Sequence, residues 1–407
     1  MKYHLFDVFG IELEYMLVHA STGKIQASVD ELMKLKTGSI VSDVDNGSIE
    51  WSNELAAHVV ELKTNGPVTD LNALDQNFHK NILEINQLLQ ARNWRLWPSA
   101  AHPLMNSELE MKLWQHSYSE IYALYNRIFD CRGHGWSNVQ SMHINLPFYD
   151  DSEFEKLHAA IRILLPILPA LSASSPILDG KFEGYMDARM KLYLTNQKQI
   201  PEMTGKVIPE QVFNYEAYKT KIFDPINAAI ADFDTDEILE HHFLNSRGAI
   251  ARFDRNAIEI RVLDLQECPL ADVAIASFSV EILKDLIHET YTPLEEQKAW
   301  HEVPLFEILN DSIEYAEEAV ISNEAYLGLF GIKAKSMPAK GVLKHLFDKV
   351  SSRMSDRHAD AIGLILKQGS LSTRILKAVD ADFSEVNILK VYHKLGDSLS
   401  KNELFLP

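Results

Sequence analysis

The feature of this sequence that most constrains its fold is the alternating stretch at residues 9–15, Phe-Gly-Ile-Glu-Leu-Glu-Tyr. Successive side chains of a β-strand point to opposite faces, so this stretch predicts a strand with one apolar face. Glu12 and Glu14 then share the other face. Neighbouring carboxylates are costly to bury unpaired, but a divalent cation offsets their charge, and oxygen ligands suit Mg²⁺ or Mn²⁺. The alternative is an exposed strand face with two solvated glutamates.

Three later segments repeat this pattern. Residues 59–64, 139–147 and 257–264 each alternate between an apolar and a polar face. Antiparallel sheets often bury one face and leave the other open, so neighbouring strands of this kind would gather their polar side chains on one concave surface. Together with Glu54, the polar faces supply the candidate metal ligands Glu12, Glu14, Glu54, Glu61, His143 and Glu259. Such a set of carboxylates with one imidazole would hold two or more divalent cations.

Arginines near these segments are candidates for binding phosphate. Arg261 shares the polar face of Glu259, and Arg189 and Arg252 are further candidates. A guanidinium can bind phosphate oxygens in a bidentate manner. The sequence has neither a Gly-x-x-x-x-Gly-Lys-[Ser/Thr] nor a Gly-x-Gly-x-x-Gly motif, so metal ions and arginines would have to hold a nucleotide. Plainer alternatives stay open: His143 as a hydrogen-bonded structural residue, and Glu259 with Arg261 as an ion pair.

Composition and charge argue against several classes of protein. The 407 residues are 46% apolar and 24% charged, which is typical of a globular protein with a large core. The net charge of -19 argues against a nucleic-acid partner, but not against a nucleotide. Two distant cysteines, Cys131 and Cys268, predict no disulfide framework and a cytoplasmic protein. We expect no signal peptide at residues 1–7 and no membrane partner, because the most apolar segment, 159–171, is too short to cross a bilayer.

Most of the remaining chain is predicted to be helical. Asn46 and Gly47 predict a tight hairpin. Apolar residues at helical spacing predict a helix that begins with Asp70 as its N-cap and ends near Arg92. Other helices are predicted over residues 29–35, 108–130, 151–171 and 270–288, and over most of the chain beyond. The Ser- and Gly-rich segment 172–189 is predicted to be a loop that carries function.

Five groups of residues, in the same order along the chain, resemble motifs of the glutamate–cysteine ligase type 2 family, a branch of the carboxylate–amine ligases. They lie at residues 10–14, 60–64, 142–145, 174–189, and 252 with 258–264. The first motif alone is weakly specific, whereas five in order are fairly specific. The chain departs from the family at Asn145, where a second His is often found, and at Phe253, where Pro is expected.

The resemblance implies an α+β fold of the glutamine-synthetase-like type: a curved antiparallel β-sheet, helices packed on its outer face and a helical C-terminal part. It implies a catalytic domain over residues 1–295. Residues 296–407 would form a mostly helical extension, and the sequence leaves open whether this extension belongs to the same domain. The sequence does not decide between a monomer and a homodimer.

The resemblance also implies an ATP-dependent ligase that forms a γ-glutamyl or similar amide through an acyl phosphate. Its substrates would be glutamate or a similar carboxylate, and an amine such as cysteine. Mg²⁺ or Mn²⁺ would be bound by Glu12, Glu14, Glu54, Glu61, His143 and Glu259. The nucleotide would be bound by Lys63, Arg252 and Arg261, and the catalytic arginines would be Arg189, Arg252 and Arg261. A metal-dependent phosphohydrolase and a catalytically silent metabolite-binding protein remain alternatives.

Overall fold

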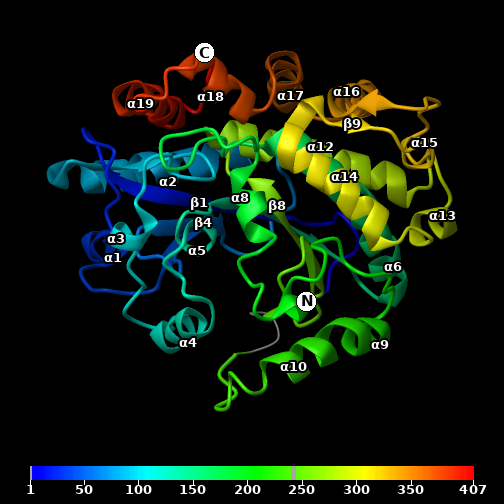
Figure 1. Cartoon of the computed structure of the whole chain (residues 1–407), viewed down its shortest axis with the longest axis horizontal. Coiled ribbons are helices and arrows are strands. Elements are labelled where there is room, and N and C mark those ends of the chain that lie inside the picture. The colour runs from blue at the N-terminus through cyan, green and yellow to red at the C-terminus, as the bar shows by residue number, and fades with distance from the viewer. Residues whose placement is uncertain (1, 240–243) are drawn as a thin grey trace.

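An antiparallel β-sheet forms the centre of the molecule. The computed structural model describes residues 2–239 and 244–407. In this part of the chain the strand order is β2-β3-β4-β1-β6-β8-β7, with β5 also paired to β1. The strands are β1 (Gly10–His19), β2 (Asp43–Asn46), β3 (Ile49–Asn53), β4 (Val59–Thr64), β5 (Trp94–Trp97), β6 (Ser141–Pro147), β7 (Ala249–Arg252) and β8 (Ala257–Asp264). The pairings are antiparallel, as predicted, and β1 pairs with β4 on one side and β6 on the other. Figure 1 labels β1, β4 and β8 near the centre of the molecule.

The register of the central strands places polar residues side by side. Glu12 on β1 lies opposite Lys63 on β4 and opposite His143 on β6. Glu14 lies opposite Glu61. Residues directly opposite one another in antiparallel strands have their side chains on the same face of the sheet. The alternating segments predicted from the sequence are therefore neighbouring strands, and their polar side chains share one face of the sheet.

Strand β8 extends this polar face on the far side of β6. Glu259 lies opposite Asn145. The register between the two strands shifts between Met142 and Ile144, so the strand pair is irregular next to His143. Such irregularities re-aim side chains and are common beside active sites.

The other face of the sheet packs into the apolar core. Ile11, Leu13 and Tyr15 of β1 are fully buried there. They share one continuous core with helices α2 (Leu74–Leu89), α6 (Asp151–Leu164) and α12 (Pro269–Ile287). Helix α12 contacts both of the other two helices and also the C-terminal helices, which explains why its residues are buried on nearly every side. One face of the sheet is thus closed by these helices, and the other carries Glu12, Glu14, Glu61 and His143 at its centre.

The chain beyond α12 is mostly helical, as predicted. Its elements are α13 (Leu294–Lys298), α14 (Glu302–Tyr315), β9 (Val320–Ile321), α15 (Glu324–Gly328), β10 (Met337–Pro338), α16 (Ala339–Val350), α17 (Asp356–Gln368), α18 (Leu371–Val379) and α19 (Glu385–Lys401). Helices α18 and α19 share a second apolar cluster with residues of β1 and β5. A fully buried ion pair between Arg374 and Glu267 also joins this region to the chain just before α12. The proposed division at residue 295 stays a prediction.

Two helix predictions were wrong in their bounds. Helix α2 begins at Leu74, and Ala73 rather than Asp70 is its N-cap; the Asp70 carboxylate instead accepts a hydrogen bond from the Asn72 amide (2.8 Å). The predicted helix at 108–130 is two helices, α3 (Ser107–Glu110) and α4 (Ser119–Phe129). Between them the chain is extended, because its backbone bonds to the loop before β4 rather than to itself.

Other differences between the predicted and the observed elements follow from proline residues and from short strands. The helix predicted at 151–171 is confirmed as helical but contains a 3₁₀ turn, Leu165–Ile167, between α6 and α7 (Leu168–Ser172). Pro166 and Pro169 lack the amide that an uninterrupted α-helix needs. The four-residue strands β5 and β7 were not predicted. No helix in the described ranges combines the length and apolarity that a membrane span requires.

Candidate active site

The ten residues predicted to hold metal, nucleotide or substrate line one cavity of about 630 Å³ on the polar face of the sheet. They are Glu12, Glu14, Glu54, Glu61, Lys63, His143, Arg189, Arg252, Glu259 and Arg261. They come from seven different elements or loops, spread over residues 12–261. The structure therefore brings the predicted residues together, although they do not all have the same surroundings.

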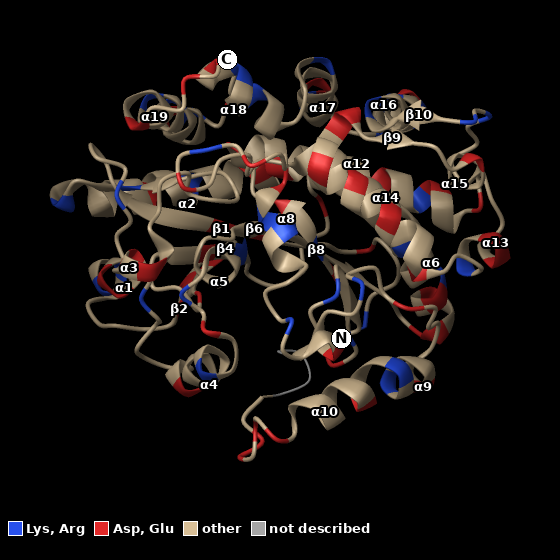
Figure 2. Cartoon of the chain, viewed as in Figure 1, with Lys and Arg blue, Asp and Glu red and all other residues tan. Residues whose placement is uncertain are grey.

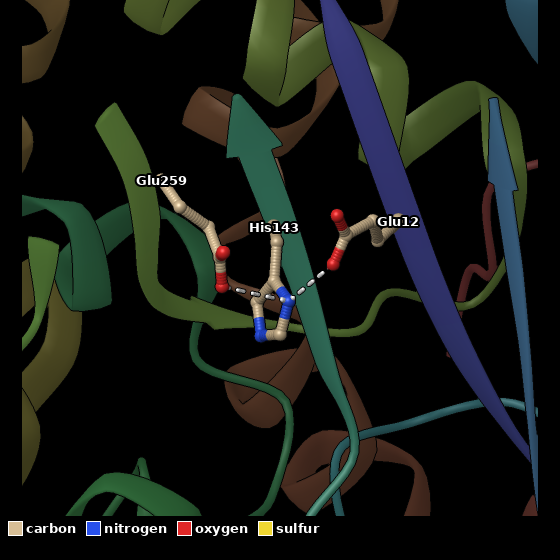
Figure 3. A group of neighbouring side chains, drawn as sticks. All are labelled: Glu12, His143 and Glu259. Carbon is tan, nitrogen blue, oxygen red and sulfur yellow. Dashed lines mark hydrogen bonds and ion pairs between the residues drawn. The ribbon is translucent and has the colours of Figure 1, made fainter. Parts of the chain in front are cut away.

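His143 lies at the centre of the acidic residues. Its Nδ1 is 2.9 Å from an oxygen of Glu12 and 3.6 Å from an oxygen of Glu259. Dashed lines mark both contacts in Figure 3. Its Nε2 is 2.8 Å from the Ser141 hydroxyl and 4.0 Å from Glu14. The ring is thus positioned by contacts on both nitrogens, and each nitrogen faces a different set of carboxylates.

Two overlapping groups have the geometry of a cation site. In the first, Glu12, His143 and Glu259 each offer a ligand atom within 4.8 Å of the others, and in the second Glu14, Glu61 and His143 do so. We call these five residues the His143 cluster. Carboxylate oxygens and one imidazole fit the preferences of Mg²⁺ or Mn²⁺. Glu54, the sixth predicted ligand, is in neither group.

The charges within the His143 cluster are unbalanced without a cation. Burial would raise the pKa of Glu12, but the hydrogen bond and charge of His143 outweigh it and lower this pKa. Burial would lower the pKa of His143, but Glu12 and Glu259 raise it. Burial and the charge of Glu12 raise the pKa of Glu61. A divalent cation would favour the ionised form of all these carboxylates at once, so the residues fit such an ion.

The basic side chains beside the His143 cluster form ion pairs with carboxylates. The Lys63 ammonium is 3.2 Å from both Glu50 and Glu61 and 2.9 Å from the Ser52 hydroxyl. On the other side, Arg261 Nε is 3.1 Å from Glu259. Lys63 and Arg261 thus flank the cluster from opposite sides, where they would also face an anionic ligand.

Arg252 and Arg189 differ in how freely they face the cavity. Arg252 is 3.7 Å from Glu259 and also pairs with Asp254 at the surface (3.2 Å). Arg189 is almost fully buried: its guanidinium donates to the Arg261 carbonyl oxygen (2.9 Å) and contacts Asp264 (3.4 Å). Arg189 therefore ties the start of α8 (Ala188–Tyr193) to β8, although its side chain also lines the cavity.

The Asp264 carboxylate anchors the loop at 172–189. It accepts hydrogen bonds from the Ser174 amide and the Ser175 hydroxyl (both 2.8 Å). The Ser175 hydroxyl in turn accepts a bond from the Arg189 amide (3.0 Å). The Ser-rich part of this loop, predicted to be functional, is thus buried beside the cavity, where it fixes the backbone of Arg189.

The two edges of the sheet give the cavity two different ends. The arginine end, beside β8, β7 and α8, is defined by Arg189, Arg252, Arg255 and Arg261. In Figure 2, basic positions on α8 lie next to β8. The α4 end, beside β2 and β3, is defined by Asp43, Glu54, Tyr118, Ile121 and Tyr122. The His143 cluster lies on β1, β4, β6 and β8, between these two edges.

The sequence analysis missed the α4 end. Asn53, which ends β3, donates a hydrogen bond to the Tyr122 hydroxyl (3.1 Å) and so fixes α4 against the sheet. Burial, together with the nearby charge of Glu54, raises the pKa of Tyr122. Burial and the charges of Glu61 and Glu14 raise the pKa of Glu54 well above its usual range. The alternation that revealed the strands could not reveal these contacts, because a helix supplies half of them.

Comparisons with known proteins agree with this geometry. The family model described as "Glutamate-cysteine ligase family 2(GCS2)" matches residues 8–315. An uncharacterized protein from Archaeoglobus fulgidus is 30% identical over 405 residues, which cover 98% of this chain and 100% of that protein.

Two solved structures share the fold. A glutamate–cysteine ligase from Francisella tularensis, in complex with AMP, has a TM-score of 0.62 at 13% identity, covering 98% of this chain and 89% of that one. A bifunctional glutathione synthetase from Pasteurella multocida has a TM-score of 0.56 at 14% identity, and the match covers 98% of this chain but 52% of that one. At these identities the structures show a common fold, whereas the match over residues 8–315 shows descent: this chain belongs to glutamate-cysteine ligase family 2.

Proposed function

We propose that this protein is an ATP-dependent ligase that joins a carboxylate, such as the γ-carboxylate of glutamate, to an amine. The observation that carries the proposal is the His143 cluster, which offers two cation-binding groups next to Arg252 and Arg261 in one cavity. Membership of glutamate-cysteine ligase family 2 supports a ligase. The AMP in the Francisella tularensis structure supports an adenine nucleotide as the co-substrate.

The proposed reaction has two steps. An oxygen of the acid attacks the γ-phosphorus of ATP, the bond to the β-phosphate oxygen breaks, and ADP leaves. The amine nitrogen then attacks the acyl carbon of the acyl phosphate. A carbon–nitrogen bond forms, the carbon–oxygen bond to phosphate breaks, and the nitrogen loses its proton to solvent. The products are an amide, ADP and phosphate, and no nucleophile from the protein is required.

The residues of the cavity would serve this reaction by position and charge. Mg²⁺ or Mn²⁺ bound at the His143 cluster would screen the repulsion between acid and triphosphate and stabilise the transferring phosphoryl group. Arg252 and Arg261 face the same region and would neutralise phosphate oxygens from the arginine end. Lys63 would do so from β4. Arg189 would act mainly by holding the loop at 172–189 against β8.

The test is amine-dependent release of ADP. Purified protein would be incubated with Mg²⁺, ATP, glutamate and a panel of amines, and ADP and phosphate would be measured. We expect release that requires both glutamate and an amine, and that stops when the cation is chelated. Release without an amine would instead indicate a phosphohydrolase, and no release with any amine would contradict the ligase.

A variant at the His143 cluster supplies the matched control. Glu12→Gln keeps the size of the side chain but removes the charge that faces His143, so turnover should be lost while the fold is retained. Thermal unfolding and circular dichroism would check the fold. An unchanged rate in Glu12→Gln would show that the cluster is not the catalytic site.

A further inference from the structure

Strand β6 carries two polar residues that lie outside the predicted ligand set and contact the carboxylates of β1. Asn145 and Ser141 lie two positions to either side of His143, so the three side chains share one face of the strand. Asn145 donates a hydrogen bond from Nδ2 to Glu12 (2.9 Å). Ser141 donates to Glu14 from its backbone amide (2.7 Å) and from its hydroxyl (3.0 Å). Each carboxylate of β1 therefore has its own donor on β6.

The two oxygens of each β1 carboxylate have different partners. Glu12 Oε1 accepts the bond from Asn145, whereas Glu12 Oε2 lies 2.9 Å from His143 Nδ1. Glu14 Oε2 accepts the bonds from Ser141, whereas Glu14 Oε1 lies 4.0 Å from His143 Nε2. A donor that binds one oxygen fixes the rotation of the carboxylate and hence the direction of its other oxygen. In both residues the other oxygen faces His143, where a cation would bind.

Asn145 belongs with the first cation-binding group, which consists of Glu12, His143 and Glu259. It lies opposite Gly10 on β1 and opposite Glu259 on β8, between the strands that carry the two carboxylates of this group. A Cβ on Gly10 would lie 3.0 Å from the Asn145 Cβ, so the missing side chain at position 10 leaves room for Asn145. Within residues 2–239 and 244–407, the Asn145 side chain donates to Glu12 and to no carboxylate of the second group.

The chemistry of Asn145 suits a residue that acts through Glu12. Its amide is neutral, and the nitrogen must face Glu12 because the amide oxygen would meet another acceptor there. Asn145 is not among the described residues that line the cavity, whereas Glu12 is. Asn145 therefore orients a cation ligand without touching the substrates and without adding charge to the site.

We propose that Asn145 and Ser141 are positioning residues that determine the two cation-binding groups separately. Asn145 orients Glu12 for the first group, and Ser141 orients Glu14 for the second. The inference rests on the cation binding that is part of the ligase function above. Because His143 is common to both groups, the groups differ only in their carboxylates. Loss of one donor then weakens the binding of one cation and leaves the other in place.

Calorimetric titration of Mn²⁺ into Asn145→Ala and Asn145→Leu tests the proposal. Both variants remove the donor, and Leu nearly keeps the volume of the side chain. We expect the wild-type protein to bind two Mn²⁺ ions. In both variants the affinity for one ion should fall about tenfold, the usual effect of losing a partner that orients a metal ligand. The affinity for the other ion should change less than about twofold.

Ser141→Ala is the comparison at the second group. The backbone amide of residue 141 still donates to Glu14, so we expect a smaller loss of affinity, about threefold, at the other Mn²⁺ ion. The double variant Ser141→Ala with Asn145→Ala should then bind both ions more weakly, by the loss seen in each single variant. A double variant in which one ion is weakened and the other binds as in the wild type would overturn the assignment of one donor to each group.

The outcomes separate this inference from the ligase function. Wild-type protein that binds Mn²⁺ but loses no affinity in the Asn145 variants, or loses it equally for both ions, would overturn the role of Asn145 alone. A single Mn²⁺ per wild-type chain would overturn the division into two groups. Wild-type protein that binds no Mn²⁺ would overturn the proposed function as well. Asn65→Ala is the control, because it removes an asparagine hydrogen bond (3.0 Å to the Gly47 carbonyl oxygen) at an exposed site outside the cavity.

Discussion

The arginine end and the α4 end of the cavity lie at opposite edges of one sheet, and they are built differently. The arginine end takes its charged groups from β7, β8 and the tightly anchored start of α8. The α4 end takes its polar groups from β2 and the end of β3, and its apolar wall from helix α4, whose Tyr122 hydroxyl accepts a hydrogen bond from Asn53. Under the proposed ligase function, the arginine end would bind phosphate groups on a rigid sheet, whereas the opposite end of the cavity has a wall that a helix supplies.

Substitutions at the two ends would test this comparison, and the largest effect is expected at the arginine end. Arg261→Gln removes a guanidinium that lies 3.1 Å from Glu259, so kcat should fall roughly 100-fold, as for other charge-stabilising donors. KM for the amine should change less than about twofold, since the α4 end is untouched. Steady-state ADP release at varied amine would measure both. Arg92→Gln, which breaks an ion pair with Glu31 outside the cavity, is the control.

A smaller effect is expected at the α4 end, and it should change KM for the amine rather than kcat. Asn53→Ala removes the hydrogen bond to Tyr122, which should raise KM for the amine several-fold by loosening α4. The expected loss of amine-binding free energy is about 1 kcal/mol, the usual net contribution of one hydrogen bond. The Mn²⁺ affinity and kcat at saturating amine should be nearly unchanged. A fall in kcat as large as that of Arg261→Gln would show that the two ends are not separable.

The last effect concerns the stability of the fold rather than turnover, next to the segment that leads to α4. His58 lies just before β4, next to Ala57, whose amide donates to the Lys112 carbonyl oxygen in the extended segment that leads to α4. Burial lowers the pKa of His58 to about 3, so the folded protein keeps it neutral while the unfolded chain takes up a proton below its ordinary pKa of 6.5. The unfolded state therefore binds more protons, and stability falls as the pH drops from 7 toward 4.

This pH dependence can be assigned with one variant. At pH 5, protonation of the unfolded chain at His58 costs the fold about 2 kcal/mol, and His58→Leu should remove this part of the loss. Urea unfolding at pH 7 and pH 5 would measure it. His102, which burial also gives a pKa lowered to about 4, should keep a similar dependence in the variant. An identical pH dependence in wild type and His58→Leu would contradict the assignment.

The comparison also shows what the sequence can and cannot reveal. Strands β4 and β8 have the bounds that the alternation predicted, because the period of two is local to each strand. Their adjacency to β1 and β6 was a hypothesis that the register confirms. Strands β5 and β7 have four residues each, too few for a periodic signal.

The α4 end could not be predicted from the same pattern. Apolar residues at helical spacing run through 108–130, but the backbone around Leu113 pairs with the chain at Ala56, which is a contact distant in sequence. The pattern also treated Glu54 like the other acids, although it lies outside both cation-binding groups. Strand register and side-chain rotamers decide which carboxylates lie close enough together to bind one ion, and a local sequence pattern specifies neither of them.

The central claim is that the His143 cluster binds divalent cations for use with ATP, and calorimetric titration of Mn²⁺ tests it most directly. We expect saturable binding to the wild-type protein, tighter in the presence of a non-hydrolysable ATP analogue, and greatly weakened in Glu12→Gln and His143→Asn. Both variants should unfold at temperatures close to that of the metal-free wild type. Wild-type protein that binds no Mn²⁺, with or without the nucleotide, would contradict the account.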